Sequence, residues 1–518
     1  MMDQDGTESS EINVEFENIP LNEKLRQHPI KIAEELFAVA ILAFFICISM
    51  YGSMFESGLG PMIVTAAPIA TFVAIMAIAA WISYWRWRRT IIVFKETELS
   101  VFRDTVFKRE VRIAYTKIAS INVNRGLINR LTDTSKLIVN INSSVNAITP
   151  EARLTFGLEQ TDRIRADLSR KMYDNKIESE EHDSMPSIVT ITKVDVVLHS
   201  LLSQPTASAL FGIGMFIFGI YELLAVSGNS STGIVALMIA ILTYALPVLM
   251  MIFHYFNYKI YRIGDTIYVS HGFIRTYYKS FKVSKINAVR LRSPLLPRVI
   301  GRYMLDAEVV GLVTGEDGGN SNLAPLLCPM KDRGTIERVI DAIVPEFKQQ
   351  ADMKRQPREA AMPIFARAAV WSVIFSAIAY VFYEGMSRIP DTGGIDIGNV
   401  AIAIIAISAI VVIALFLNGI WSRKIVEYGM ADDVFTFVTG VVDRVIVTVP
   451  YDKVQIADIS SGPLSRPYGL AKCDVSLLSS VGSMKVTSGF FDAHELEAIP
   501  EEVISRIEDG RYDYRKYF

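Results

Sequence analysis

Basic side chains recur at fixed positions along this chain of 518 residues. Three lysines and three arginines are spaced 168 residues apart: Lys117, Lys285 and Lys453, and Arg130, Arg298 and Arg466. Ammonium and guanidinium groups bind phosphate oxygens, so these residues could contact phospholipid headgroups. Alternatively, each lysine begins a strand with its stem along apolar surface, and each arginine pins a turn by donating to local carbonyls. Only a lipid-binding measurement separates the two interpretations.

The charge around these residues differs among the three copies. Residues 90–134 hold 8 basic and 5 acidic side chains, residues 258–302 hold 10 and 1, and residues 426–470 hold 3 and 6. The basic residues of the middle window are Lys259, Arg262, Arg275, Lys279, Lys282, Lys285, Arg290, Arg292, Arg298 and Arg302. Each such side chain near an anionic leaflet contributes about 1 kcal/mol. We expect this copy to contact anionic lipid or an acidic partner, and the third copy is one candidate for that partner. The alternative is a solvated basic face that binds nothing.

Residues that usually perform catalysis or hold metals lack the required spacing. The six histidines are scattered, and the three cysteines lie too far apart for a CxxC motif. No nucleophile elbow, P-loop, HExxH or kinase motif occurs, and the glycine-rich segment 315–320 is expected to be a loop. We therefore expect a protein that is not an enzyme and holds no cofactor or metal. A net charge of −3 gives no reason to expect nucleic-acid binding.

The elements that must position the basic residues begin with long apolar segments. Hydrophobic residues make up 51% of the chain and charged residues only 21%, which excludes an ordinary soluble protein. Six runs approach the ~20 residues that cross a bilayer as a helix: 36–54, 62–85, 207–225, 233–253, 368–383 and 400–421. They form three hairpins whose outer flanks are basic, as at Arg86, Lys259 and Arg423. Because Lys and Arg accumulate on the cytoplasmic side, we expect a multi-pass protein of the cytoplasmic (inner) membrane with both termini cytoplasmic.

The same 168-residue shift superposes the hairpins and the segments that follow them, which predicts three tandem units. Each segment after a hairpin has short β-branched and aromatic runs with close turns, and ends in an amphipathic helix. Gly301 and Gly469 align with each other, and Asp133 takes their place in the first copy. The predicted domains are a disordered acidic N-terminus (1–27), hairpins at 28–85, 195–255 and 362–422, and β-rich domains at 86–175, 256–348 and 423–518.

Turn residues and short motifs in the β-rich domains carry a resemblance to a known family. Gly272 and Gly440 occupy tight hairpins that need positive φ, where the first copy has Asp104 as a substitute. A Lys-Ile or Lys-Val pair begins the next strand in each copy, and residues 296–301 read Leu-Pro-Arg-Val-Ile-Gly. The chain resembles the bacterial pleckstrin-homology (PH)-like membrane proteins of the YdbS/YdbT type, in which a hairpin of two spans carries a PH-like domain.

The resemblance implies an α+β membrane protein. Its six transmembrane helices would form three hairpins, each followed by a cytoplasmic PH-like β-sandwich or barrel with a C-terminal helix. We expect an integral membrane scaffold or binding protein whose PH-like domains bind partner proteins or anionic lipid; the resemblance suggests envelope maintenance or antimicrobial-peptide defence. The expected partners are the lipid bilayer and a membrane protein of the same family, with the oligomeric state left open. The alternative is a transporter or channel-like assembly gated by the PH-like domains.

Overall fold

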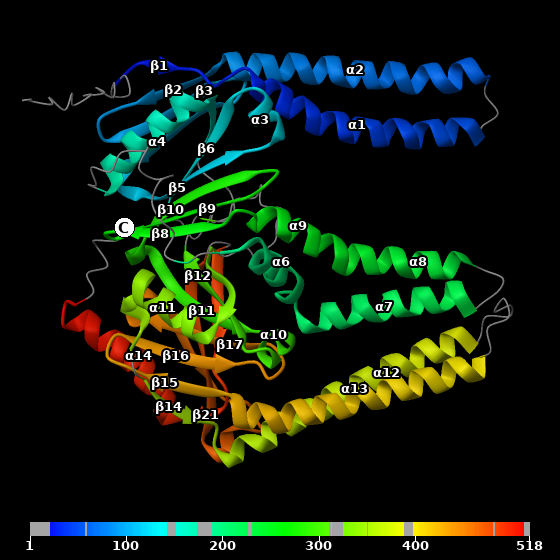
Figure 1. The fold of residues 1–518 in the computed structure, drawn as a ribbon, viewed down its shortest axis with the longest axis vertical. Helices are drawn as coiled ribbons and strands as arrows, with labels where there is room; N and C mark the ends of the chain where they lie inside the picture. Colours follow the sequence, from blue (N-terminus) through cyan, green and yellow to red (C-terminus); the bar gives the residue numbers. More distant parts are fainter. Residues whose placement is uncertain are drawn as a thin grey trace, which may run out of the picture. The chain divides into compact units, whose positions relative to one another are not determined.

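The computed structural model describes residues 21–56, 60–141, 152–173, 189, 191–225, 230–309, 312, 325–349, 351–387, 397–479 and 482–511 (Figure 1). The chain divides into two compact units, Met1–Ile141 with Glu151–Met185, and Asn142–Pro150 with Pro186–Phe518. The first unit holds the first repeat and the second unit holds the other two. Most of the N-terminus predicted to be disordered, and the glycine-rich segment 315–320, lie outside the described residues.

Six helices in the described part of the chain are long and apolar enough to cross a membrane, and each contains one of the predicted runs. They pair as α1 (Ile30–Glu56) with α2 (Pro61–Arg88), α7 (Thr206–Ala225) with α8 (Ser230–Ala240), η2 (Ile241–Ala245) and α9 (Leu246–Tyr255), and α12 (Ala361–Ser387) with α13 (Ile397–Ile425). Only 6 to 17% of the most apolar window of each helix is buried inside the protein. Apolar helix surface of this extent requires lipid around it, so the protein is a membrane protein.

A module with one order of elements follows each hairpin: three antiparallel strands, a 3-10 turn, a strand, a short helical turn, further strands and a terminal helix. The first module comprises β2 (Thr90–Phe94), β3 (Glu98–Asp104), β4 (Lys108–Ala114), η1 (Tyr115–Lys117), β5 (Ile118–Arg125), α3 (Leu127–Leu131), β6 (Thr134–Ile141), β7 (Ala152–Gly157) and α4 (Leu158–Tyr173). A short strand before the first hairpin, β1 (Lys24–Leu25), pairs with β2.

The second and third modules repeat this order. The second comprises β8 (Lys259–Ile263), β9 (Thr266–His271), β10 (Thr276–Lys282), η3 (Val283–Lys285), β11 (Ile286–Ser293), α10 (Leu295–Val299), β12 (Arg302–Val309), β13 (Leu326–Asp332) and α11 (Arg333–Ile343). The third comprises β15 (Glu427–Met430), β16 (Val434–Thr439), β17 (Arg444–Pro450), η6 (Tyr451–Lys453), β18 (Val454–Ser460), η7 (Arg466–Tyr468), β19 (Leu470–Ser479), β20 (Gly482–Thr487), β21 (Phe491–Asp492) and α14 (Ala493–Glu508). The predicted α+β architecture of hairpins alternating with β-rich modules is confirmed.

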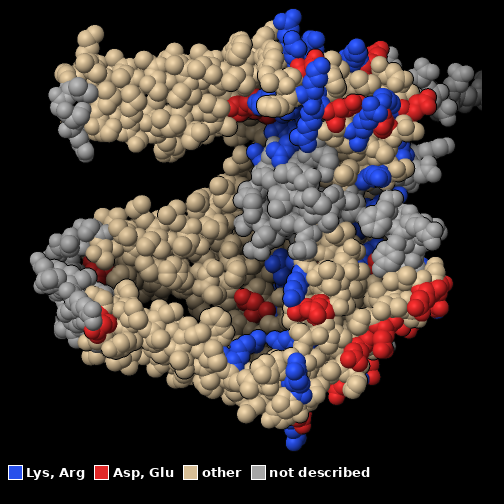
Figure 2. Space-filling model, turned by 180° about the vertical axis from the view of Figure 1, so that it is seen from behind, with Lys and Arg blue, Asp and Glu red and all other residues tan. Residues whose placement is uncertain are grey.

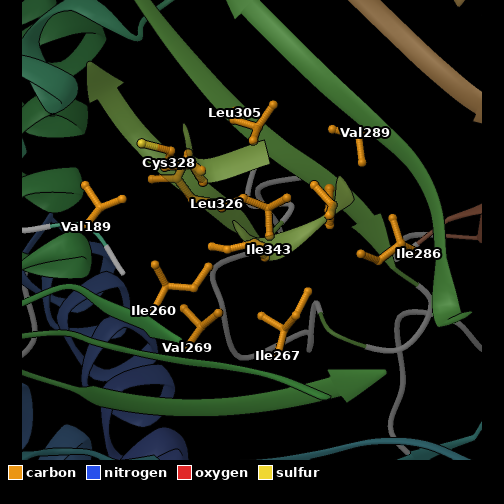
Figure 3. Close-up of a cluster of buried hydrophobic side chains, with 14 of the residues drawn as sticks. Val189, Ile260, Ile267, Val269, Ile286, Val289, Leu305, Leu326, Cys328 and Ile343 are labelled. Carbon is orange, nitrogen blue, oxygen red and sulfur yellow. The ribbon is translucent and has the colours of Figure 1, made fainter. Parts of the chain in front are cut away.

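The core of the second module lies between its two groups of strands. Ile260 and Val269 project from β8 and β9, Leu305 from β12 and Cys328 from β13, and all are at most 3% exposed (Figure 3). The amphipathic helix α11 closes this core with Ile343 and its apolar neighbours. The strands of the described residues form open sheets and no closed barrel. Of the two predicted forms, the sandwich therefore describes the module and the barrel does not.

One sheet passes from the second module into the third. Its seven strands run in the order β13-β12-β11-β17-β16-β15-β14, where β14 (Asp352–Arg355) precedes the third hairpin. The join is the antiparallel pair β11 and β17, in which Val289 lies opposite Thr448 and Arg292 lies opposite Val445. The last strands of one module and the first strands of the next are therefore a single hydrogen-bonded layer.

Turns at equivalent positions show which predicted glycines are required. Gly272 has φ +115°, and a Cβ added there would lie 1.9 Å from the carbonyl oxygen of Arg275. Asp133 adopts φ 46°, close to the φ of +67° at Gly301, so aspartate takes the left-handed conformation at this turn. The expectation for Asp104 is wrong, because Asp104 ends strand β3 and is not a positive-φ residue. Residues 105–107 form a different hairpin tip in the first module.

Candidate functional site

The repeated lysines each end the 3-10 turn that joins the two groups of strands in a module. Lys117 is exposed, whereas Lys453 forms an ion pair with Asp452 at 2.9 Å. Lys285 is half-buried, and burial lowers its pKa, followed by repulsion from the positive charges of Lys453 and Lys282. The structure therefore brings the repeated lysines of the second and third modules close enough to repel each other.

The repeated arginines lie on the short helical turns α3, α10 and η7. Arg130 and Arg466 are exposed. Arg298 donates from Nη2 to the carbonyl oxygen of Val441 at 2.9 Å. An arginine that holds a carbonyl was one of the two sequence interpretations, but the carbonyl belongs to the next module and not to the local turn.

These turns also present apolar side chains that the protein does not cover. Leu131 on α3 is 87% exposed and Val299 on α10 is 78% exposed. Further exposed apolar side chains on the same turns and their flanks are Leu127, Leu295, Leu296, Ile300, Leu464 and Tyr468. Each turn thus combines one arginine with two or more uncovered apolar groups, a combination that the sequence analysis did not single out.

Contacts place these turns beside the first helix of a hairpin. In the first unit, Lys136, at the start of the strand after α3, pairs with Glu34 in α1 at 3.2 Å. In the third repeat, Leu470, just after η7, packs with Ile364 of α12. We call α3, α10 and η7, with the apolar residues named above, the membrane-side turns.

In the second repeat, the contact with the first helix of the hairpin involves a residue of the third repeat. Asp443, at the tip between β16 and β17, accepts hydrogen bonds from the backbone N–H and the hydroxyl of Thr206, the first residue of α7. Because Arg298 holds Val441 at this same tip, α10 also lies near the start of α7. A carboxylate at a helix N-terminus satisfies otherwise unpaired N–H groups and is favoured by the helix dipole.

Two of the predicted basic residues are neutralised within the protein. Arg290 Nε donates to Asp306 Oδ1 at 2.6 Å, and Arg292 Nε donates to Asp306 Oδ2 at 2.5 Å. Arg290 also pairs with Glu308 at 3.1 Å. Burial would lower the pKa of Arg290, but the charges of Asp306 and Glu308 outweigh it and raise the pKa. These acids lie just beyond the window 258–302, which is why the charge count overstated the exposed positive charge of this module.

The other basic residues of the middle window have varied surroundings. Arg262 pairs with Glu346 at 2.8 Å, and Lys279 is buried with its ammonium 5.6 Å from the centre of the Tyr277 ring. Arg302 lies opposite Asp332 across β12 and β13. The remaining members, Lys259, Arg275 and Lys282, are partly exposed. The structure therefore does not gather the predicted residues into one cationic surface.

Side-chain bonds reinforce the join between the second and third modules. Asn287 donates from Nδ2 to the carbonyl oxygen of Leu478 at 2.8 Å. The Ser479 hydroxyl donates to Glu308 Oε1, also at 2.8 Å. Glu308 thus accepts from the third module while pairing with Arg290 in its own. The alternation Arg290-x-Arg292 on one strand and Asp306-x-Glu308 on the next was a readable signal for this cluster.

Three histidines, from α6, α9 and β9, converge near the base of the second hairpin. The rings of His254 and His271 have centroids 4.6 Å apart, and His199 lies edge-on to Tyr255 at 5.1 Å. Burial, followed by the positive charge of Arg292, lowers the pKa of His199 to about 3. Among the described residues, no group of three or more His, Cys, Asp or Glu side chains is arranged to hold a metal ion.

Comparison with known proteins explains the tandem arrangement. Residues 37–172, 208–343 and 367–514 each match the family described as bacterial PH domain. The chain belongs to this family. The UPF0699 transmembrane protein YdbT of Bacillus subtilis (strain 168) is 20% identical to the chain over 326 residues, which span 58% of this chain and 65% of YdbT. No solved structure matches the chain significantly. The predicted resemblance and its three copies are thereby confirmed.

Acidic side chains of the third bacterial PH domain gather along one helix. Figure 2 shows them along α14 on one face of the third domain. Exposed members include Glu497, Glu501 and Glu508, which recur at intervals that place them on one face of the helix. Together with the excess of acids in residues 426–470, they make the third domain the acidic one of the three.

Proposed function

We propose that this bacterial PH domain protein is a scaffold of the cytoplasmic membrane that acts without a catalytic step. The continuous seven-stranded sheet is the observation that carries the proposal. It joins the second and third domains, and each domain is attached to its own hairpin, so two hairpins are tied to one layer of strands. A rigid layer of this kind suits a protein that fixes the spacing of membrane segments and offers surfaces to other molecules.

The sidedness of the proposal follows from the ends of the helices. Arg86 and Arg88 lie in the last turn of α2, and Arg423 and Lys424 lie in the last turn of α13. Positive residues at span ends favour the cytoplasmic side. All three domains and both termini then lie in the cytoplasm.

The first molecule that these domains contact is proposed to be the lipid beneath them. The membrane-side turns lie beside the helices that enter the bilayer, and their uncovered side chains include Leu131 and Val299. Complete burial of such a side chain contributes about 1.5 to 3 kcal/mol, so partial insertion of two on one turn contributes on the order of 2 kcal/mol. The arginine on each turn suits the phosphate region just above the acyl chains.

A fluorescent probe on the turn tests this contact. Val299→Cys in the full-length protein, labelled with an environment-sensitive dye and reconstituted into nanodiscs, should emit at shorter wavelength and be quenched by lipids that carry a quencher. Glu337→Cys, on the exposed face of α11, is the matched control and should report water. Equal quenching at both sites, or none at Val299, contradicts lipid contact and leaves partner proteins as the ligands.

If Arg298 contacts lipid phosphate, anionic lipid should increase the quenching of the dye at Val299→Cys and shift its emission further to shorter wavelength. Nanodiscs of neutral and of anionic lipid, compared at low and high salt, provide that measurement. The alternative of a transporter or channel predicts solute flux across proteoliposomes that contain the protein, whereas the scaffold proposal predicts none.

A further inference from the structure

The join between the second and third domains shows how these domains associate. Strand β11 pairs with β12 inside its own domain and with β17 of the next domain. The pairing brings Ala288 of β11 into the core of the third domain, where it is completely buried. Arg298 adds a hydrogen bond to Val441 at the tip beside β17. An exposed strand edge of one domain is thus covered by a strand of its neighbour.

The repeat supplies further edges of each kind, and two of them end their sheets. Strand β18 of the third domain is equivalent to β11, and β4 of the first domain is equivalent to β17. Within the described residues, β18 pairs only with β19, and β4 is the last strand of the sheet β1-β2-β3-β4. Ile456, which corresponds to Ala288, is 63% exposed instead of buried. Unpaired strand edges with exposed apolar groups are sites where another chain can add a strand.

The charges of these two edges are complementary. Strand β4 carries three basic residues and one acid, Lys108, Arg109, Arg112 and Glu110, of which Glu110 pairs with Arg112. Strand β18 carries Asp458 as its one charged residue. Residues 90–134 hold 8 basic and 5 acidic side chains, and residues 426–470 hold 3 and 6. Opposite charges steer two surfaces together and disfavour pairing of two identical edges. Pairing of β18 with β4 is therefore favoured over pairing of two β18 strands or two β4 strands.

We propose that β18 of one chain pairs antiparallel with β4 of a second copy of this chain. In the register that β11 and β17 show, Asp458 lies opposite Val111, and Arg109 is its diagonal neighbour on the same face. Arg466 occupies the position of Arg298 and donates to the carbonyl oxygen of Thr105, as Arg298 does to that of Val441. Ile456 becomes covered, as Ala288 is.

The association is head-to-tail, because each copy contributes one edge of each kind. Such an interface builds a ring if the rotation closes and a chain if it does not. The inference depends on the strand edges and not on the lipid contact proposed above, so the two experiments fail independently.

Disulfide trapping between two differently tagged full-length copies tests the pairing. One copy carries Asp458→Cys and the other Val111→Cys, both in a Cys47→Ser background because Cys47 is the native cysteine that is not buried. Directly opposite strand residues have Cα atoms about 4.5 to 5.5 Å apart, within the range that a disulfide bridges. Mild oxidation in membranes should give a species of about twice 57.8 kDa that carries both tags.

The matched control moves one cysteine to the other edge of the same sheet. Lys485→Cys on β20 is exposed in the same domain but should not join Val111→Cys. Absence of the doubly tagged species, or an equal yield with Lys485→Cys, overturns the proposal. Partner chains that carry neither tag, trapped in place of the second copy, also overturn the choice of partner.

Dilution of the untrapped protein in detergent provides a second measurement. Asp458→Lys should weaken self-association by a factor of about 1.4 to 5, because a single cross-strand charge pair contributes roughly 0.2 to 1 kcal/mol. Adding Arg109→Glu should restore it. A wild-type protein that stays monomeric at every concentration contradicts the inference. So does a charge reversal that changes nothing.

Discussion

Lowering the pH should destabilise the second domain through His199. This residue lies on α6 (Lys193–Leu202), the helix before the second hairpin, and its side chain is enclosed by protein. Its Nδ1 is buried with no hydrogen-bond partner among the described residues. Burial first, and then the positive charge of Arg292, lowers the pKa from 6.5 to about 3, with a partial offset from Asp306. The folded domain therefore holds His199 in its neutral form.

The sign and size of the effect follow from these two pKa values. Well above pH 6.5, the pKa in the unfolded chain, the histidine is neutral in both states and contributes no pH dependence. Between pH 6.5 and about 3, the unfolded chain binds a proton that the folded domain does not, so stability falls as the pH falls. At pH 4.5, about two units below the unfolded pKa, the loss is on the order of 3 kcal/mol.

Hydrogen exchange measured by mass spectrometry can check this loss. Peptides from β11–β13 of the full-length protein in nanodiscs give the free energy of local opening at each pH, once the pH dependence of the chemical exchange rate is removed. His199→Phe keeps an aromatic ring against Tyr255 and removes one titrating group. Its opening free energy should therefore fall less than that of the wild type from pH 7.5 to 4.5, and the remaining fall comes from other titratable groups such as the neighbouring His254. Carboxylates with lowered pKa, such as Asp195, act mainly below this range.

Peptides from β5 and β6 of the first unit serve as the internal control. If wild type and His199→Phe show the same dependence on pH, or if the wild type shows none, the reasoning about the buried neutral histidine is wrong.

Two further predictions concern stability. Asp306→Ala should lower the unfolding free energy by about 3 to 5 kcal/mol, because it leaves Arg290 and Arg292 half-buried without their shared carboxylate, and a melting temperature unchanged from wild type would contradict this. Gly272→Ala should prevent stable expression, because its Cβ would lie 1.9 Å from the Arg275 carbonyl oxygen. Gly301→Ala has open space around the added Cβ and should lower the unfolding free energy by only about 1 to 2 kcal/mol. Equal melting temperatures for the two variants would refute the steric argument.

The membrane hairpins and the threefold repeat were predictable because their signals are local in the sequence. A run such as 62–85 is apolar whatever it packs against, since lipid surrounds it, and it lies within α2. The turn at Gly272 was likewise predictable, because positive φ there is a property of the local backbone. Asp104 was predicted wrongly, because the first domain makes its hairpin with a different tip.

The basic residues could be found in the sequence but their surroundings could not. Arg290 and Arg292 read as part of a cationic surface, yet their charges meet Asp306 only after β11 and β12 pair. The contact between Asp443 and the start of α7 joins positions 237 residues apart, and no local pattern marks it. The convergence of His199, His254 and His271 has the same origin.

The sequence by itself determined the family, the six spans, the repeat and the succession of strands and a terminal helix in each domain, because hydrophobic periodicity and turn residues act over a few positions. Only the tertiary structure decided which strand edges join neighbouring domains and which charges remain exposed. Strand pairing and ion pairing depend on groups that are close in space and distant along the chain. The same rule explains why one repeat buries Ala288 under a neighbouring strand while another leaves Ile456 uncovered.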